Sequence, residues 1–350
     1  MTSGYEGLIC QTMTRVGKFI VVWLFVGLLL AIACLLFMAP AEPRYLGRPL
    51  RDWARNLTLF NWPPGLKLYA ELERRQRQDA EARLAIQQLG TNAVPALLRY
   101  FLRQDPAWRQ AMIDRVNRQK FVRVHLRTAA EAEAQGELGL LVLGPAANGA
   151  LPALARAIDD SRRGLTAIRI MAAVGSAATP YFTNALFTQT NRAVRLALID
   201  GLGGRGPTAP IAIPALLRCA REPDAAIREA AVCTLSTASR DETLLVPVGL
   251  DALEDIDAAV RFAGCGALGV CGTRASAAAD ALLRHITTES DPDVRANCAA
   301  CLFAIAPEAA AAAGFPREEF NPNFRGRYQR IWPSVTAGFW QAVQRIKNVP

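Results

Sequence analysis

The sequence is poor in the residue types and motifs on which most catalytic and metal sites depend. Its 350 residues include only two histidines, His125 and His285, and neither lies near a nucleophile motif. No GxSxG, HExxH or phosphate-binding glycine loop occurs, and the glycine-rich stretch 201–206 follows an expected helix rather than a strand. We therefore expect no catalytic site, no metal and no cofactor, although such motifs would not reveal carboxylates gathered in a groove.

The overall composition excludes several classes of chain. Hydrophobic residues make up 51% and charged residues 20%, which excludes intrinsic disorder and collagen. Eight cysteines in a chain of this length do not make a small disulfide scaffold. The length suits two ordinary domains or one elongated repeat array.

One apolar run near the start is long enough to cross a bilayer. Residues 19–39, from Phe19 to Ala39, carry no charge over 21 positions, and a helix of that length would span roughly 31 Å. We predict an uncleaved single-pass membrane anchor. Small residues around Pro40 leave a signal-peptidase site as an alternative, and the stretch 31–34 only faintly resembles a lipobox.

The charges beside this run leave its orientation open. Arg15 and Lys18 precede it, and arginines follow at positions 44, 48, 51 and 55. Because two basic residues precede the run and four follow it, the charges favour a cytoplasmic location for the C-terminal side. A large domain can nevertheless be translocated despite such flanking charges.

The net charge of +9 is unevenly distributed along the chain. Residues 40–127 carry +9 and residues 315–350 carry +4, whereas residues 128–314 carry −5. A possible basic binding surface lies within residues 105–127, at Arg115, Arg118, Lys120, Arg123 and Arg127. A solvated helix face is the simpler interpretation. Acidic lipid headgroups or an acidic protein are the candidate ligands, while sparse aromatic residues and a membrane tether disfavour nucleic acid.

A repeat with a period of about 33 residues is the strongest pattern in the sequence. Arginines preceded by Val or Ile recur with this period, and the last interval is one residue longer than the others. Leu follows each arginine seven residues later, and Asn or Asp precedes it by four residues. The arginines are Arg195, Arg228, Arg261 and Arg295.

Each repeat predicts two helices. The Asn or Asp caps the first helix, and small or aliphatic residues after the arginine pack against the next helix. Gly144 and Gly269 are expected to mark helix ends, and Pro214 and Pro247 to open the second helix in its first turn. Stacking such hairpins buries their apolar sides, so the sequence predicts an all-α fold organised as an α–α superhelix, or solenoid.

Two stretches carry a family resemblance. Asp291-Pro-Asp-Val-Arg295 with Leu302, and Ala259-Val-Arg261 leading to Gly269, resemble HEAT repeats of the short type shared with phycobilisome-lyase-like proteins. The stretches 45–53 and 89–98 resemble membrane-anchored bacterial HEAT-repeat proteins. That resemblance implies that the protein is located in the bacterial inner membrane, and it slightly favours the extracytoplasmic side for the repeats. It implies no particular activity.

The resemblance also implies that the repeated arginines are structural and bridge to acidic groups or helix-end carbonyls of a neighbouring repeat. A concave anion-binding surface is the alternative. Two positions depart from the pattern. Arg169 lies closer to Arg195 than one full period, and Glu137 stands where an arginine is expected.

The predicted organisation has five parts. Residues 1–18 form an N-terminal tail and 19–39 the transmembrane helix. Residues 40–79 are a linker with N-terminal capping helices. Residues 80–314 hold about seven HEAT-like repeats, interrupted by the basic insertion 105–127. Residues 315–350 regain aromatic residues and are expected to form a C-terminal cap, with an interfacial helix as the alternative.

The spacing of Cys298 and Cys301 matches the CxxC motif of metal and redox sites. Zinc would need two further thiolate or imidazole ligands, and His285 stands alone. Cys233 and Cys265 also follow a repeat arginine, where other units place Ala or Gly. We interpret these cysteines as small, buried core residues, with a disulfide left open.

The sequence thus predicts a membrane-tethered helical-repeat scaffold that binds a protein partner. A tethered enzyme or lyase-like protein that uses the solenoid groove is the alternative. A third is binding of anionic lipid or nucleic acid through the basic N-terminal flank.

The anchor can be tested by extraction. The full-length protein should stay in membranes through carbonate washing, and a chain that begins at Glu42 should be soluble, because residues 19–39 supply the apolar length. Release of the intact chain by carbonate would contradict the anchor. A mature N-terminus at Glu42 would instead identify a signal peptide.

Overall fold

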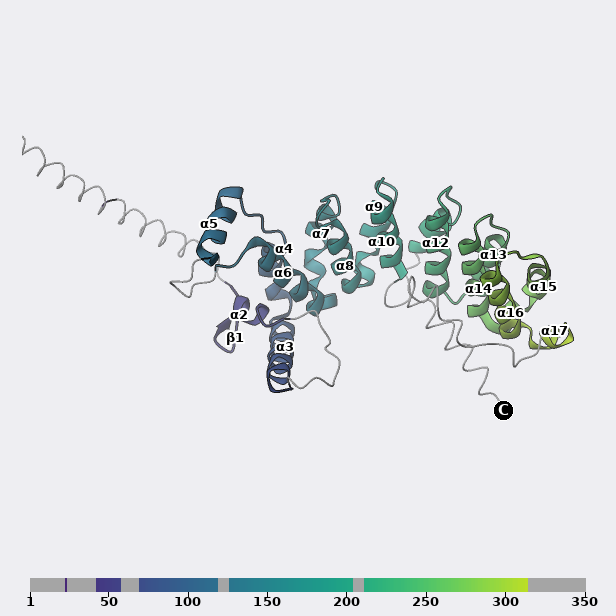
Figure 1. Ribbon diagram of the computed structural model, residues 1–350, viewed down its shortest axis with the longest axis horizontal. Coiled ribbons are helices and arrows are strands. Elements are labelled where there is room, and N and C mark those ends of the chain that lie inside the picture. The colour runs from purple at the N-terminus through teal and green to yellow at the C-terminus, as the bar shows by residue number, and fades with distance from the viewer. Residues whose placement is uncertain (1–22, 24–41, 58–68, 119–125, 204–210, 314–350) are drawn as a thin grey trace, which may run out of the picture.

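The computed structural model describes Trp23 and residues 42–57, 69–118, 126–203 and 211–313. In this part of the chain all regular secondary structure is helical apart from one short β-hairpin, which confirms the all-α class. The helices are spread along the longest axis of the molecule, with α2 and α5 near one end and α17 at the other (Figure 1).

Between residues 69 and 312 the described α-helices, apart from one inserted helix, form seven successive pairs in chain order. The first helices of the pairs are α3 (Tyr69–Leu89), α6 (Ala129–Leu143), α8 (Gly164–Val174), α10 (Arg192–Gly203), α12 (Ala225–Ala238), α14 (Ala258–Cys271) and α16 (Pro292–Ile305). The second helices are α4 (Val94–Phe101), α7 (Leu151–Ala157), α9 (Thr179–Leu186), α11 (Ala212–Cys219), α13 (Glu242–Leu253), α15 (Ala279–Thr288) and α17 (Pro307–Ala312). Each first helix contacts the first helix of the next pair. This row of contacts makes the core continuous from α3 to α16.

The first helices begin where the sequence predicts. Oδ1 of Asp224, Asp257 and Asp291 accepts hydrogen bonds from backbone N–H groups of the first turn of α12, α14 and α16, at 2.8–3.1 Å. Asn191 does the same for α10 at 2.9 Å. These bonds satisfy donors that have no partner inside the helix.

The ends of the first helices follow the sequence prediction only in part. Gly144 adopts φ +51° at the end of α6, a left-handed value that favours glycine. Gly269, however, lies inside α14, and the helix ends at Gly272 with φ +58°. Short 3₁₀ segments lead to four of the second helices, α4, α7, α9 and α15. They are η1 (Gly90–Ala93), η2 (Gly144–Ala150), η3 (Ser176–Ala178) and η4 (Gly272–Ala278).

Pro247 does not open its helix. The helix α13 starts at Glu242, because Asp241 accepts a hydrogen bond from the backbone N–H of Thr243 at 2.9 Å and begins the helix earlier. Pro247 therefore sits inside α13 and leaves one intrahelical hydrogen bond unmade.

The N-terminal part contains a hairpin that the sequence analysis did not predict. Strand β1 (Arg44–Tyr45) pairs antiparallel with β2 (Arg48–Pro49), and the short helix α2 (Leu50–Ala54) follows directly. The indole N–H of Trp53 donates to the carbonyl oxygen of Tyr45 at 3.3 Å. This hairpin precedes the capping helices expected over residues 40–79.

The helix α5 (Ala107–Arg118) interrupts the pairs between α4 and α6, within the basic insertion predicted at residues 105–127. Its outer side is open to solvent at Trp108, which is 69% exposed, and Ile113 anchors its buried side.

Among the described residues, the stretch Ala129–Ala157 is long and apolar enough to cross a membrane. It comprises α6, η2 and α7, which are broken at Gly144, and Leu140, Leu151 and Leu154 are buried in the core of the stack. The burial makes this stretch a core element of the helix pairs. The predicted anchor 19–39, apart from Trp23, and the predicted cap 315–350 lie outside the described residues.

The pairing predicts which deletions the protein tolerates. Removing residues 225–257 deletes α12 and α13 together and joins Asp224 to Ala258, so that Asp224 can cap α14 in place of Asp257. We expect a shorter array that is still folded, with strongly helical circular dichroism. Removing only residues 225–241 deletes α12 alone and should expose the apolar surfaces of α10, α11 and α14 that pack against it, causing aggregation. Equal tolerance of both deletions would contradict the assigned unit.

Candidate functional site

The repeated arginines lie at the junctions between successive helix pairs. Arg228 on α12 holds Asp255 with two parallel bonds, from Nε to Oδ2 and from Nη2 to Oδ1, each 2.8 Å long. Its Nη1 donates to the carbonyl oxygens of Glu222 and Pro223 at 2.8 and 2.7 Å. One side chain thus ties the turn before its own helix to the turn before the next first helix.

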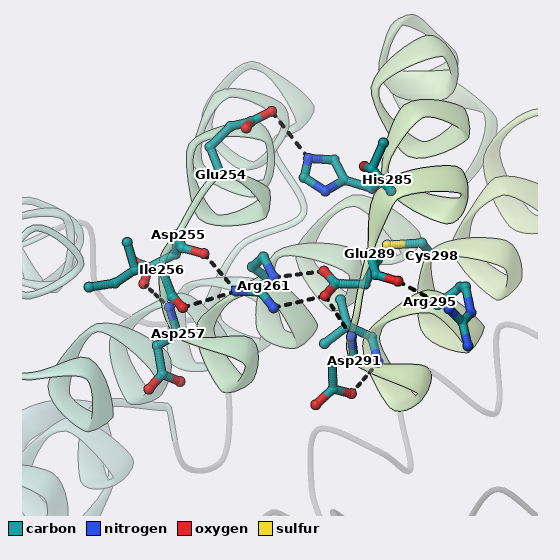
Figure 2. Close-up of polar contacts among 12 residues, drawn as sticks. Glu254, Asp255, Ile256, Asp257, Arg261, His285, Glu289, Asp291, Arg295 and Cys298 are labelled. Atoms are coloured by element: carbon teal, nitrogen blue, oxygen red, sulfur yellow. Dashed lines mark hydrogen bonds and ion pairs between the residues drawn. The ribbon is translucent and has the colours of Figure 1, made fainter.

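Arg261 repeats this arrangement one unit later (Figure 2). Its Nε and Nη2 donate to the two carboxylate oxygens of Glu289 at 2.7 and 2.8 Å. Its Nη1 donates to the carbonyl oxygens of Asp255 and Ile256 at 2.9 and 3.1 Å. We call this contact, seen at Arg228 and Arg261, the arginine clamp.

The clamp of Arg261 is well shielded from water. The Arg261 side chain is 15% exposed and that of Glu289 only 3%. The hydrogen bond from Arg261 lowers the pKa of Glu289, and the same bond raises the pKa of Arg261. Because the folded pKa of Glu289 is depressed, the clamp stabilises the fold above the ordinary carboxyl value of 4.5 and loses that contribution as the pH falls through the lowered pKa.

Arg195 and Arg295, the first and last arginines of the repeat, form only some of the hydrogen bonds of the clamp. Nη2 of Arg195 donates to Glu222 at 2.6 Å, and its Nε donates to the carbonyl oxygen of Leu186 at 3.2 Å. Arg295 donates to the carbonyl oxygen of Glu289 at 3.1 Å. All four arginines of the repeat therefore bond to carbonyls at the end of a second helix or in the turn that follows it. Three of them also reach a carboxylate before the next first helix.

The carboxylates of the clamp were not predicted from the sequence. They are Glu222, Asp255 and Glu289, each two residues before the residue that caps a first helix. They recur with nearly the same period as the arginines, and this shared period is the signal that could have found them.

The N-terminal units are joined differently. Arg169 on α8 forms an ion pair with Glu137 on α6, so the residue found in place of an arginine is itself the partner of one. Arg163 is 2% exposed and was not singled out from the sequence. It donates to Asp160 at 3.2 Å, to the carbonyl oxygen of Arg103 at 2.9 Å and to Glu133 at 3.4 Å.

The structure describes three of the five residues of the predicted basic surface. Arg115 and Arg118 are exposed on α5, whereas Lys120 and Arg123 lie outside the described residues. Arg127 is engaged: its guanidinium stacks 4.0 Å from the ring centre of Tyr100, and its Nη1 donates to Gln135 at 2.9 Å. Arg127 is therefore half-buried, and Tyr100 and Gln135 hold its side chain against the fold.

Tyr100 is itself part of a polar cluster. Its hydroxyl donates to Glu42 at 2.5 Å. Burial, together with the hydrogen bond and the negative charge of Glu42, raises the pKa of Tyr100 to about 12. This bond ties the start of the described chain to α4.

The cysteines are buried among apolar residues. Cys298 and Cys301 are fully buried on α16, and the Sγ of Cys298 lies 3.1 Å from the Sγ of Cys265 on α14. Within the described ranges no group of three or more His, Cys, Asp or Glu side chains could hold a metal ion.

The two histidines have different places. His285 on α15 faces Glu254, with Nε2 3.1 Å from a carboxylate oxygen (Figure 2), while His125 lies outside the described residues. The glycine-rich stretch 201–206 ends α10 at Gly203 and continues beyond the described ranges.

Comparison with protein-family models gave no match, and a search of curated proteins also found none.

The clamp makes a sharp prediction for stability. Arg261→Ala leaves Glu289 buried without its partner, so we expect a loss of about 3 kcal/mol in the free energy of unfolding. Arg274→Ala is the matched control, because Arg274 and Glu242 form an ion pair with side chains 53% and 39% exposed. Its loss should stay within about 0.5 kcal/mol. Urea unfolding of chains that begin at Glu42 measures both. Equal losses in the two variants would show that the clamp has no special role.

Proposed function

We propose that this protein is a membrane-tethered scaffold whose HEAT-like helical repeats form a solenoid that binds a protein partner. The observation that carries this proposal is the clamp, which recurs with the same geometry at Arg228 and Arg261. A contact repeated in this way favours the same relative position and orientation for each two successive helix pairs. Arrays of this kind present extended surfaces along their length.

The polar groups of the clamp support binding rather than chemistry at these positions. Their donors and acceptors are bonded to each other and to backbone carbonyls, so they are not available to a substrate. The surface open to a partner is then the exposed side of the helices. The acidic balance of residues 128–314, at −5, favours a partner with basic groups.

The tether is the second element of the proposal. It rests on the 21 uncharged residues from Phe19 to Ala39, which would hold the repeats at a bacterial inner membrane. The family resemblance favours the extracytoplasmic side for the repeats.

Affinity capture of the full-length protein from solubilised membranes tests the scaffold. We expect a discrete partner at fixed stoichiometry, bound less well by the variant lacking residues 225–257, because that variant presents one helix pair fewer. Mass spectrometry identifies the partner and light scattering gives the ratio. A co-purifying small molecule that the protein converts would favour the alternative, a tethered enzyme that uses the solenoid groove.

A second function has an observation of its own, on α5. Trp108 and Met112 are 69% and 49% exposed, and Arg115 continues the same side of the helix one turn later. A helix that places an exposed Trp beside basic side chains suits the interface of an anionic bilayer. We propose that α5 contacts acidic lipid headgroups when the tether brings it to the membrane.

Liposome binding tests the lipid contact. The chain that begins at Glu42 should bind anionic vesicles at low salt and be released as salt rises, because each basic group near the surface contributes about 1 kcal/mol that salt screens. Arg115→Gln combined with Arg118→Gln should weaken binding roughly 10-fold or more.

The control changes two exposed arginines elsewhere, Arg221→Gln with Arg284→Gln, which alters net charge equally. Co-sedimentation measures all three proteins. The same loss in both double variants would mean that net charge, and not α5, governs the binding.

A further inference from the structure

Two thiols from neighbouring helix pairs meet in the core near the C-terminal end of the described chain. The Sγ atoms of Cys265 on α14 and Cys298 on α16 are 3.1 Å apart, and both residues are fully buried. The two helices are the first helices of successive pairs and pack against each other directly.

Polar contacts near the thiols fix the position of α16 relative to α14. The Arg261 clamp holds Glu289, which precedes α16, against the start of α14. The side-chain N–H of Asn297 donates to the carbonyl oxygen of Phe262 at 3.0 Å, one residue before Cys298 in the chain. Because these bonds fix the two helices in register, the sulfur atoms face each other as a consequence of the repeat itself.

We propose that Cys265 and Cys298 form a disulfide that links two successive repeat units covalently. Each thiol loses its proton, one sulfur–sulfur bond forms, and the two electrons pass to the disulfide of a thiol oxidase, which is reduced to a dithiol. A dithiol–disulfide oxidant of this class works in extracytoplasmic compartments. The disulfide therefore rests on the extracytoplasmic placement of the repeats that is part of the proposed function.

The bond forms while the two units assemble. The attacking species is a thiolate, and burial raises the pKa of Cys265 well above its ordinary value, so the folded thiol is protonated as well as shielded. Once formed, the disulfide is protected from reductants by the same burial. The link is then a permanent part of the stack and not a switch.

Cys271 and Cys301 are the competing thiols. Both are buried on the same two helices, and burial raises the pKa of Cys301 well above its ordinary value. The 3.1 Å contact singles out Cys298 as the partner of Cys265. Linkage through Cys301 is accordingly a distinct outcome that the experiment can detect.

The test uses full-length protein isolated from the membranes in which it is made, with free thiols blocked by N-ethylmaleimide at lysis. Digestion without reductant and mass spectrometry should show one peptide pair joined through Cys265 and Cys298. Under denaturing conditions six of the eight cysteines should react and these two should not. Full alkylation of both residues, or a link to Cys271 or Cys301 instead, would overturn the proposal.

Two variants separate the link from a general effect of losing a core cysteine. Cys298→Ala should fold, since α12 carries Ala231 at the equivalent place three residues after Arg228, and it should lose the linked peptide. Cys271→Ala should keep the linked peptide. Reduction in denaturant followed by refolding with reductant should lower the melting temperature of wild type and Cys271→Ala by about 5 °C or more, and leave that of Cys298→Ala unchanged. A linked peptide at Cys265 in Cys298→Ala, or no shift in wild type, would count against the assigned pair.

Discussion

The stack depends on the two-point bond between a guanidinium in one helix pair and a carboxylate that stands just before the next. In the clamps of Arg228 and Arg261 the planar fork of the arginine matches the carboxylate, and the remaining donors reach carbonyls at the end of the preceding turn. The carboxylate has a further task. Asp255 and Glu289 each accept the backbone N–H of the residue two positions later, at 2.9 Å, and that residue caps the next first helix. Clamp and cap are therefore linked, and the start of each helix is held by the arginine of the helix before it.

The clamp sets geometry more than it supplies net stability. Taking an arginine and a carboxylate out of water has a large desolvation cost, and a good ion pair recovers roughly that amount. The favourable balance comes from the continuous apolar core, in which residues such as Leu198, Leu235 and Leu268 lie fully buried on successive first helices. The core would tolerate small slides between pairs, whereas the directional bonds of the clamp would not. The Cys265–Cys298 contact shows how closely the register of two neighbouring units is defined.

The N-terminal pairs reach a similar result by other contacts. Glu137 and Arg169 exchange the roles seen in the later units, and the buried Arg163 connects α6 with the turns that follow α4 and α7. The hairpin β1–β2 and α2 cover this end, with Trp53 bonded to the hairpin backbone. The departures from the repeat thus fall where the stack begins and where α5 is inserted, and the regular clamp occupies the part farther from the predicted tether.

Local signals in the sequence determined the elements of this protein. The period of the arginines, the Asp and Asn residues four positions before them and the small residues after them were enough to predict an all-α chain, the starts of the first helices and the burial of the cysteines, because capping and helical periodicity act within one or two turns. Tertiary structure decided what these elements do to each other. The carboxylate partners of Arg195, Arg228 and Arg261 lie 27 or 28 residues away along the chain. The two cysteines that meet are 33 residues apart rather than neighbours in the CxxC spacing, and Arg127 is drawn from the basic surface onto Tyr100. Such contacts depend on how far one helix pair is rotated and shifted against the next, and that relation arises only when the packed cores and the directional bonds of several units are satisfied together.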